Sequence, residues 1–383
     1  MKCAKLFSII DELNENYIKV LEDVCNIESQ TTDKKGVDGV CDYFVKMAEK
    51  HNWLVEKLEL ETAGSPVCIT INPDAKSAPI IFSGHADTVH PKGLFGYPPT
   101  HIDGDKIYGP GVLDCKGGIV SAFMALDALE RVGFCDRPVK LIIQTDEETG
   151  SKTSGKKTIE FMREKSIGAA AFLNCESLND NNSVILARKG IARYRLDITG
   201  KAGHSSKCYD AVNAVTEAAH KIIELEKMKD KDGITCNCGV IEGGTVANTV
   251  AEKCSFLADI RFANEDQYEK TKETVLRVAN TSYLEGSSCE VSEISYRPSM
   301  PFTDANFSLY SKMAEICAEN DMPKLNWKKA TGGSDAAYIT QFGIPCVDDV
   351  GVYGDRYHSK DEFAYISSLA HSAKLMAATT YCL

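Results

Sequence analysis

The feature that most constrains the fold is a series of short apolar runs, each of which ends abruptly in polar residues. Three such runs cover residues 79–82, 139–143 and 169–173. Between the first two, apolar residues at helical spacing predict a helix over residues 119–129 that stops near Gly133, a typical C-cap residue. Buried strands that alternate with helices predict an α/β fold with a mostly parallel sheet covered on both faces.

Imidazoles and carboxylates follow each of these predicted strands. His85 with Asp87, Glu147 with Glu148, and Glu176 come directly after the three apolar runs. In open sheets of this kind, ligands gather at the carboxyl ends of the strands. We therefore expect a functional site at this edge of the sheet.

The pattern changes near residue 190, where apolar and polar residues alternate from 192 to 198 as in a half-buried antiparallel strand. A helix over about 210–228, two strands ending near Phe262, a helix over 265–283 and a strand over 289–297 follow. This order, βαββαβ, predicts an α+β domain of one sheet and two helices. We expect residues 190–300 to form a domain inserted into a discontinuous one made of residues 1–189 and 301–383. Two further helices are predicted near the N-terminus, over about 5–28 and 39–51.

Charge and cysteine content limit the partners and the compartment. The net charge of −12 argues against a nucleic-acid surface or an anionic membrane as partner. No apolar run approaches the roughly 20 residues that span a bilayer, and the N-terminus does not resemble a secretory signal. Fifteen cysteines without framework spacing indicate a reducing, cytoplasmic setting. Cys236 and Cys238 are a close pair, for which strand packing or a metal clip are the two interpretations.

The pair His85 and Asp87 has the spacing at which two side chains on a strand point the same way. Asp87 could then accept the far ring proton of a metal-bound His85, which fixes the tautomer of the imidazole. A surface pair is the alternative. Asp114 lies between glycines and a proline in residues 109–118, a composition typical of a loop with close backbone approach. For Asp114 the alternative is a solvated turn.

Glu147 and Glu148 are adjacent carboxylates that repel each other unless a positive centre or a proton offsets the repulsion. Alternation would send one toward a metal and leave its neighbour to reach a bound water, whereas a solvated acidic turn is the plain alternative. Glu176 and His358 complete the set at two further element ends. Imidazoles and carboxylates are the ligands of paired zinc ions.

Six segments resemble the M20 metallopeptidases. They are residues 83–89, 109–118, 145–150, 200–205, 331–338 and 357–359. The chain is most similar to the glutamate carboxypeptidase branch, with acetylornithine deacetylase, succinyl-diaminopimelate desuccinylase and aminoacylase as relatives. The resemblance covers nearly the whole chain. It implies a three-layer, zinc-peptidase-type catalytic domain with a mixed, mostly parallel sheet, and an inserted lid and dimerisation domain.

The resemblance also implies roles for the candidate residues. Asp114 would bridge two zinc ions per chain, for which Co²⁺ or Mn²⁺ can substitute. His85 and Glu176 would complete one metal site, and Glu148 and His358 the other. Glu147 would act as general base and acid, with Asp87 behind His85. His204, from the partner subunit of a homodimer joined through the inserted domain, would stabilise the developing negative oxygen; a plain loop histidine is the alternative.

The sequence departs from the family pattern at Cys115, Cys175 and Ser177. We expect both cysteines to point away from the metals, with a thiolate ligand as the alternative. The resemblance further implies a cis peptide bond between Asp114 and Cys115. Glutamate at position 176, where some aminopeptidase and dipeptidase relatives have aspartate, favours the carboxypeptidase and deacylase side.

Five positions match substrate-binding residues of the relatives, namely Asn248, Arg261, Arg297, Lys189 and Gly332. Arginine is suited to a free carboxylate because its fork binds both oxygens. The expected substrate is therefore a small peptide or an N-acyl amino acid cleaved next to a free carboxylate, as in a glutamate carboxypeptidase. Lys189 would contact an acidic side chain or be a solvated cation. N-acyl-amino-acid deacylase and dipeptidase activities are the alternatives.

Two other functional classes remain. A thiol-dependent hydrolase could use Cys115 or Cys175 as its nucleophile. A non-catalytic zinc-binding protein would be expected to lack the base, yet Glu147 is present.

Overall fold

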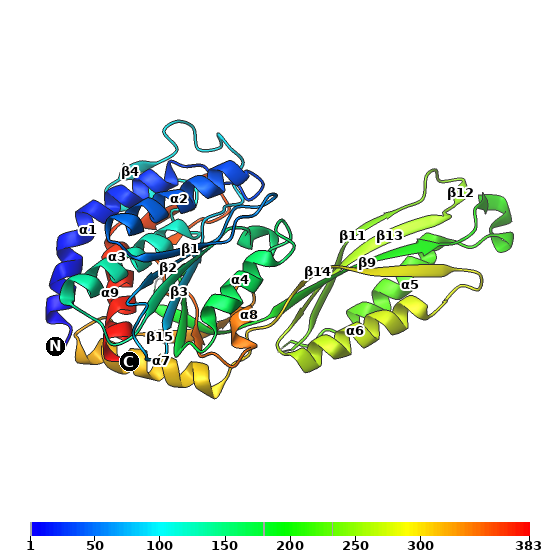
Figure 1. Ribbon diagram of the computed structural model, residues 1–383. Helices are drawn as coiled ribbons and strands as arrows, with labels where there is room; N and C mark the ends of the chain where they lie inside the picture. The colour runs from blue at the N-terminus through cyan, green and yellow to red at the C-terminus, as the bar shows by residue number, and fades with distance from the viewer. Residues whose placement is uncertain (1, 179–180, 232) are drawn as a thin grey trace. The chain divides into compact units, whose positions relative to one another are not determined.

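The computed structural model describes residues 2–178, 181–231 and 233–383, and it divides the chain into two compact units (Figure 1). Unit 1 consists of the residues up to Leu186 together with Phe302–Lys329 and Ser334–Leu383. Unit 2 consists of Ala187–Pro301 and Ala330–Gly333. The short segment 330–333 belongs to unit 2, whereas the sequence had placed it with the discontinuous domain.

Unit 1 contains a six-stranded sheet with the strand order β1-β2-β6-β3-β7-β16. β3 runs parallel to both β6 and β7, and β16 runs parallel to β7, while β2 is antiparallel to β1 and β6. The predicted mixed, mostly parallel sheet is therefore confirmed. The strands are β1 (Leu54–Lys57), β2 (Val67–Ile71), β3 (Ile80–His85), β6 (Val139–Gln144), β7 (Ala171–Asn174) and β16 (Cys346–Val347).

Helices cover both faces of this sheet. α1, α2, α3 and α9 lie on one side and α4 and α8 on the other, while α7 packs against β16 and α9 (Figure 1). Their bounds are α1 (Ala4–Cys25), α2 (Lys34–Lys50), α3 (Lys116–Val132), α4 (Lys157–Ser166), α7 (Asp304–Glu319), α8 (Ala336–Thr340) and α9 (Ser367–Cys382). The three-layer arrangement is confirmed. Among the described residues, no helix is both long and apolar enough to cross a membrane.

The helix predicted over 39–51 begins five residues earlier, at Lys34. The side chain of Asp33 accepts a hydrogen bond from the backbone N–H of Gly36, which satisfies an otherwise unpaired donor of the first turn. The end of α3 is as predicted, with Gly133 in the left-handed conformation at its C-cap. The helix therefore begins at the Asp33 cap, before the apolar residues from which it was predicted.

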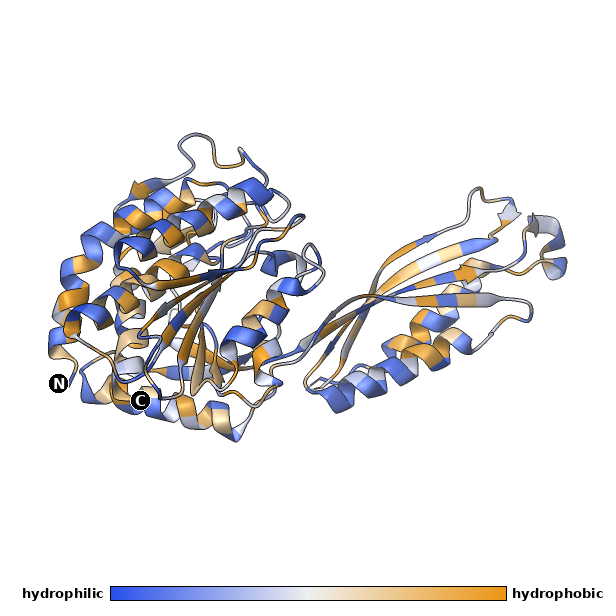
Figure 2. Cartoon of the chain, viewed as in Figure 1, coloured by the Kyte–Doolittle hydropathy of each residue, from blue (hydrophilic) through white to orange (hydrophobic). Residues whose placement is uncertain are grey.

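The core of unit 1 lies between the sheet and its helices, where β2, β3 and β6 carry side chains buried on both faces apart from Lys140 (Figure 2). The rings of Phe44 on α2 and Phe123 on α3 pack against each other in a tilted arrangement, with their centroids 5.7 Å apart. Gly118 allows α3 to start close to the end of β7, since a Cβ there would lie 2.0 Å from the carbonyl oxygen of Cys175. The loop before α3 is thereby held next to Glu176.

A second, four-stranded sheet of unit 1 has the order β17-β18-β5-β4. Its strands are β4 (His101–Asp103), β5 (Lys106–Tyr108), β17 (Gly354–Asp355) and β18 (Phe363–Tyr365), and all neighbours are antiparallel. A two-stranded ribbon pairs β8 (Ser183–Arg188) with β15 (Asn326–Ala330).

Unit 2 is built around a four-stranded antiparallel sheet with the order β11-β13-β9-β14. β9 (Gly190–Thr199) alternates buried and more exposed residues, as the sequence predicted. The other elements are α5 (Ala214–Glu226), β11 (Thr235–Gly243), β13 (Lys253–Phe262), α6 (Glu265–Asn280) and β14 (Ser288–Arg297), with a small pair of β10 (Gly203–His204) and β12 (Thr249–Val250). The main elements follow the order βαββαβ, which confirms the predicted α+β topology.

Candidate active site

The carboxyl ends of three adjacent strands of unit 1 supply most of the candidate residues. His85 is the last residue of β3, the 3-10 turn η1 (Glu147–Thr149) follows β6, and Glu176 follows β7. Asp114 lies in the loop before α3, and His358 lies in the hairpin between β17 and β18. The fold therefore brings together residues that are up to 273 positions apart in the sequence (358 − 85).

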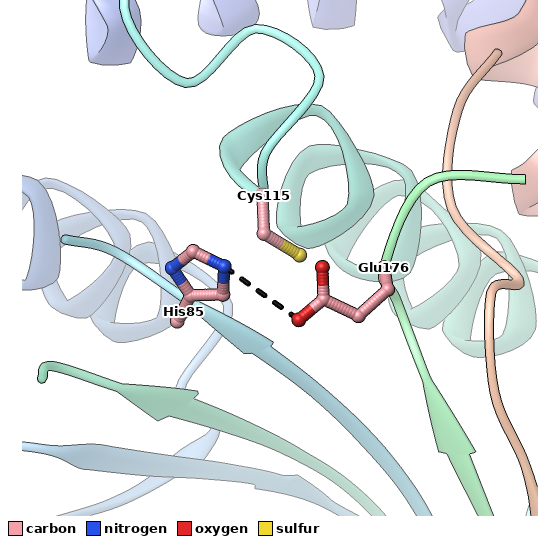
Figure 3. Close-up of side chains that lie close together, drawn as sticks. All are labelled: His85, Cys115 and Glu176. Carbon is pink, nitrogen blue, oxygen red and sulfur yellow. Dashed lines mark ion pairs between the residues drawn. The ribbon is translucent and has the colours of Figure 1, made fainter. Parts of the chain in front are cut away.

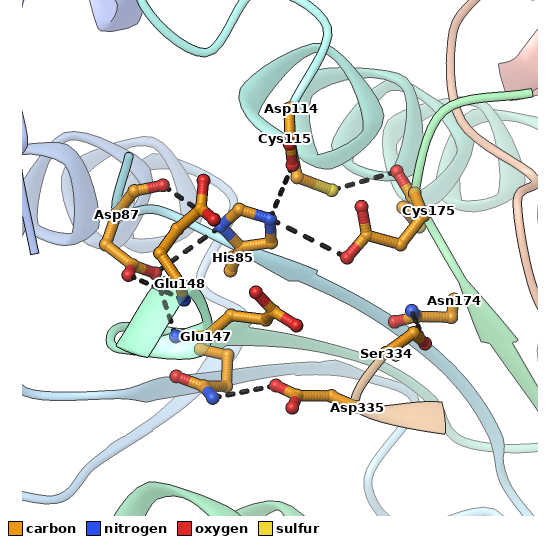
Figure 4. Close-up of polar contacts among 12 residues, drawn as sticks. His85, Asp87, Asp114, Cys115, Glu147, Glu148, Asn174, Cys175, Ser334 and Asp335 are labelled. Atoms are coloured by element: carbon orange, nitrogen blue, oxygen red, sulfur yellow. Dashed lines mark hydrogen bonds and ion pairs between the residues drawn. The ribbon is translucent and has the colours of Figure 1, made fainter. Parts of the chain in front are cut away.

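Asp114 lies between two imidazoles. Its Oδ1 is 2.9 Å from Nε2 of His85, and its Oδ2 is 3.1 Å from Nε2 of His358 (Figure 4 shows the contact with His85). One carboxylate thus contacts two histidines, one through each oxygen. This is the arrangement of a carboxylate that can bridge two cations.

Each imidazole has a second carboxylate beside it. Oε1 of Glu176 is 3.6 Å from Nε2 of His85, as Figure 3 shows, and Oε2 of Glu148 is 3.5 Å from Nε2 of His358. The five predicted ligands therefore form two sets that share Asp114: His85 with Glu176, and His358 with Glu148.

The cluster perturbs the pKa values of its members. Burial would lower the pKa of His85, but Glu176, Asp114 and Asp87 together raise it well above its ordinary value. Hydrogen bonds from His358 and His85 hold the pKa of Asp114 below its usual range despite burial.

The pKa values of the two glutamates of the cluster, Glu148 and Glu176, are raised, whereas that of Asp114 is lowered. Burial, reinforced by the charge of Asp114, raises the pKa of Glu148 to about 7 even though His358 lowers it. Burial also raises the pKa of Glu176 well above its ordinary value, with further contributions from Asp114 and Glu147. The pKa of His358 is raised to about 10 by its hydrogen bonds to Asp114 and Glu148. Carboxylates outnumber imidazoles in the cluster, so the donor set fits a divalent cation.

The ligand atoms of His85, Asp114 and Glu148 lie within 4.8 Å of one another, and so do those of His85, Cys115 and Glu176. The expectation that Cys115 points away from the metal ligands is wrong in this respect, because its sulfur lies beside His85 and Glu176 (Figure 3). The Sγ–H of Cys115 donates to the carbonyl oxygen of Cys175 at 2.9 Å, which fixes its direction. The peptide bond between Asp114 and Cys115 is cis, as expected.

Asp87 is completely buried and contacts both His85 and the turn that carries Glu147 and Glu148. Its carboxylate accepts hydrogen bonds from the backbone N–H groups of Glu147 and Glu148, at 3.1 and 3.2 Å, and from the hydroxyl of Thr31 at 2.7 Å. Its Oδ1 is also 3.4 Å from Nδ1 of His85. Asp87 therefore links the His85 strand to the turn with the two glutamates, a connection that sequence reasoning did not include.

Glu147 lies in η1 with only 8% of its surface exposed. Its charge contributes to the raised pKa of both Glu148 and Glu176. In the view of Figure 4, the side chain of Glu147 is drawn below His85, whereas Asp114 is drawn above it. Glu147 is therefore placed apart from the five predicted ligands and can have a different role.

A second layer of polar residues surrounds the cluster, and the sequence analysis did not identify it as such. Asn174 donates to Ser334 and Asp348 at 3.2 and 2.9 Å, and Gln144 donates to Asp335 at 2.7 Å (Figure 4). Ser334 and Asp335 belong to the segment 331–338 that carried the family resemblance. Their hydrogen bonds connect this segment to the last residues of β6 and β7.

The remaining predicted residues all lie in unit 2. His204 is exposed, and its Nδ1 is 2.8 Å from the hydroxyl of Ser206. Arg261 donates to Asp259 at 2.8 Å, and Lys189 donates to the carbonyl oxygen of Gly233 at 2.5 Å. Asn248, Arg297 and Gly332 also belong to this unit: the carbonyl oxygen of Asn248 accepts from Ser205, that of Gly332 accepts from Arg188, and Arg297 is the last residue of β14.

Comparison with known proteins identifies the family. Residues 81–381 match the model of peptidase family M20/M25/M40. The chain is 28% identical over 372 residues to carboxypeptidase G2 of Pseudomonas sp. (strain RS-16), covering 95% of this chain and 88% of the relative. It is 24% identical over 350 residues to succinyl-diaminopimelate desuccinylase of Wolinella succinogenes, covering 85% and 88%.

The fold is also found in solved structures. The structure of aminopeptidase PepT from Bacillus cereus superposes with a TM-score of 0.77 at 24% identity and covers 96% of this chain and 97% of that one. The sequence match, the fold and the arrangement of the site agree, and the chain therefore belongs to peptidase family M20/M25/M40.

Proposed function

We propose that this protein is a two-metal amidohydrolase that cleaves a peptide or N-acyl amide bond next to a free carboxylate. The observation that carries the proposal is Asp114, which lies between His85 and His358 while each imidazole has its own second carboxylate. This donor set suits two zinc ions that share one carboxylate, with Co²⁺ or Mn²⁺ as substitutes. When bound, such ions supply Lewis acidity, which polarises a carbonyl and makes a water acidic near neutral pH.

Glu147 is the proposed general base and acid. It lies in the buried turn next to Glu148 and is not one of the five proposed ligands, so it is the carboxylate left to accept a proton from the attacking water and return it to the leaving nitrogen. Asp87 fixes this geometry because it accepts the backbone N–H groups of Glu147 and Glu148 and contacts His85. The base is thus held by the same residue that orients a ligand.

The free carboxylate of the substrate is assigned to unit 2. Arg261 and Arg297 can each present two N–H groups to a carboxylate, and Asn248, Gly332 and Lys189 lie in the same unit. The similarity to carboxypeptidase G2 over 95% of the chain favours a carboxypeptidase. We propose that it releases an acidic residue such as glutamate, whose side chain Lys189 could contact.

A deacylase of N-acyl amino acids is the second candidate, because the chain also matches succinyl-diaminopimelate desuccinylase over 85% of its length. A dipeptidase is disfavoured by glutamate at position 176. A thiol-dependent hydrolase is disfavoured because burial raises the pKa of Cys115 well above its ordinary value, which keeps the sulfur in its poorly nucleophilic thiol form. A non-catalytic zinc-binding protein is disfavoured because it would not need a buried carboxylate, Glu147, beside the metal ligands.

Assembly as a homodimer through unit 2 is part of the proposal. His204 is exposed and bonded only locally to Ser206, so it is available to the active site of a partner subunit. The sheet of unit 2 has two edge strands, β11 and β14, and Val240 and Ile241 on β11 are about half exposed. An exposed apolar edge strand is a surface that a two-fold mate can cover.

A cytoplasmic location is proposed on the state of the cysteines. All fifteen are free thiols in the structure, and most of them are buried. Free thiols in this number are typical of a reducing compartment.

The proposed function is tested by hydrolysis of a panel of peptidyl-glutamates, other dipeptides and N-acyl amino acids. We expect hydrolysis with zinc, loss of activity in a chelator, and recovery when the metal is returned. Activity that survives complete metal removal but not iodoacetamide would overturn the metal mechanism in favour of a thiol enzyme. A preference for N-acetyl or N-succinyl substrates would select the deacylase candidate.

A further inference from the structure

We propose that Glu362 is a positioning residue that fixes the spacing of the two metal sites. The inference rests on the proposed function, because it concerns the same cluster. Glu362 is completely buried, and it was not part of the predicted ligand set. A buried carboxylate must be compensated by several hydrogen bonds, and its partners show what it does.

Glu362 first holds the loop that carries Asp114. Its Oε1 accepts hydrogen bonds from the backbone N–H groups of Leu113 and Asp114, at 2.9 and 3.1 Å. Its own carbonyl oxygen accepts from the N–H of Gly109 at 3.3 Å. One residue therefore holds both ends of the loop 109–114, and it does so at the peptide of the shared carboxylate itself.

Glu362 also closes the hairpin that carries His358. β17 and β18 pair at Gly354 with Ala364 and at Asp355 with Phe363, and the N–H of Glu362 donates to the carbonyl oxygen of Ser359 at 3.2 Å. The hairpin 354–364 and the loop 109–114 leave neighbouring strands, β18 and β5, of one sheet. The side chain of Glu362 spans these two segments at the point where they diverge.

The third partner belongs to the segment that follows His85. The Nε2–H of buried His90 donates to Oε2 of Glu362 at 2.6 Å, since a carboxylate can only accept. Glu362 thus contacts three segments, and each of them carries a predicted ligand: His85, Asp114 and His358. Glu362 therefore connects three of the five segments that carry predicted ligands, two through its side chain and one through its backbone.

This geometry distinguishes the reach of the side chain from its charge. Glutamine at 362 keeps the reach, can still accept from Leu113 and Asp114, and can donate to the other tautomer of His90. Aspartate keeps the charge but is shorter by one methylene and cannot span the same partners. If Glu362 is a positioning residue, Glu362→Gln should disturb metal binding less than Glu362→Asp does. A purely electrostatic role predicts the reverse.

The test measures metal binding rather than turnover. Chelator-stripped wild type, Glu362→Gln, Glu362→Asp and Glu362→Ala are titrated with Co²⁺ and followed by visible absorption, which reports ligand geometry. We expect Glu362→Asp and Glu362→Ala to bind Co²⁺ about 10- to 100-fold more weakly, the typical effect of losing a residue that orients ligands, with altered spectra. Glu362→Gln should stay within about threefold of wild type.

Glu217 in unit 2 provides a matched control. It is also fully buried and accepts two backbone N–H groups, from Tyr283 and Leu284, while pairing with Lys221. Glu217→Ala should lower the melting temperature but leave the Co²⁺ affinity and spectrum unchanged. If Glu362→Ala does not fold, the comparison of the glutamine and aspartate variants still decides.

Equal Co²⁺ affinity and spectra in wild type and Glu362→Asp would overturn the inference, as would a weaker affinity of Glu362→Gln than of Glu362→Asp. Wild type that binds Co²⁺ normally but hydrolyses none of the panel substrates would contradict the proposed function alone. The two failures are therefore separable.

Discussion

The candidate residues of unit 1 and those of unit 2 differ in burial and in their partners. In unit 1, His85 is 2% exposed and His358 is exposed, but the predicted ligands contact one another, and His85 also contacts the buried Asp87. In unit 2, His204 is exposed and its ring is hydrogen-bonded to Ser206, and Arg261 is bonded to Asp259 of its own strand. The candidate ligands of unit 1 thus contact one another, whereas His204 and Arg261 of unit 2 are each bonded to a near neighbour.

This difference indicates how the work of the enzyme is divided. A cluster whose members contact one another is preorganised for chemistry, because its geometry does not depend on the substrate. Exposed groups on a separate unit gain their role only when a substrate or a second subunit reaches them. Substitutions in unit 1 should therefore act on chemistry or metal content, and those in unit 2 on transition-state contacts and substrate binding.

The largest effect is expected for Glu147→Gln. The glutamine keeps the shape of the side chain but cannot take a proton, so turnover should fall by about 10²- to 10⁴-fold. The metal content should equal that of wild type. The adjacent Glu148→Gln is the control, because it should lose metal as well as activity. Retention of most activity by Glu147→Gln would show that another group is the base.

The next effect concerns His204. His204→Ala should lower kcat by about 10²- to 10³-fold, as for removal of one donor to a developing oxyanion, with metal content unchanged. A 1:1 mixture with Glu147→Gln chains should recover roughly a quarter of wild-type activity after subunit exchange, since only heterodimers hold one intact site. A mixture as inactive as its parents, with exchange demonstrated, would mean that His204 does not act across subunits.

A smaller effect is expected for Arg261→Ala. Loss of its bonds to a substrate carboxylate should raise KM by about 10- to 100-fold and leave kcat nearly unchanged. Arg193→Ala is a matched control, because Arg193 also bonds to Asp259, at 2.6 Å, and is not a predicted substrate residue. Equal changes in KM for the two variants would assign Arg261 to the structure of its sheet.

The smallest effect is a pH dependence of metal stabilisation. The pKa of Glu148 is raised to about 7, so the metal-free fold favours the protonated group. Its contribution is fully present below the ordinary value of 4.5 and is lost as the pH rises through about 7. Glu176 shifts in the same direction because of its burial.

Zinc replaces those protons and offsets the carboxylate charges. The rise in melting temperature caused by zinc should therefore be at least ~3 °C larger at about pH 8 than at about pH 5.5. Calorimetry with and without zinc measures this difference, and Glu148→Gln should reduce it. A zinc effect that does not change with pH would contradict the assigned pKa shifts.

Much of the fold and of the candidate cluster could be predicted because the information is local. Apolar runs that end at His85, at residues 147–148 and near Glu176 are visible in the sequence, and the carboxyl ends of neighbouring parallel strands must meet. The same local signal predicted β9 from its alternation. The periodicity of the sequence was sufficient to predict a side chain's direction wherever that direction depends only on the helix or strand to which the residue belongs.

Other parts depend on contacts between distant segments. Glu362 and Thr31 carry no periodic signal that relates them to Asp114 or Asp87, and only tertiary closure brings them together. The direction of Cys115 was mispredicted because it depends on the position of the carbonyl oxygen of Cys175, 60 residues away. The start of α2 was missed because the apolar face begins after the Asp33 cap.

The central claim is that the cluster of unit 1 holds two metal ions about Asp114, and metal stoichiometry tests it most directly. Chelator-stripped protein is reconstituted with zinc, freed of excess ions and analysed by plasma mass spectrometry. We expect about two zinc ions per chain for wild type and Glu147→Gln, and fewer for Glu148→Ala and for His358→Ala. A value of one per chain for wild type, unchanged in Glu148→Ala and His358→Ala, would contradict the two-metal account.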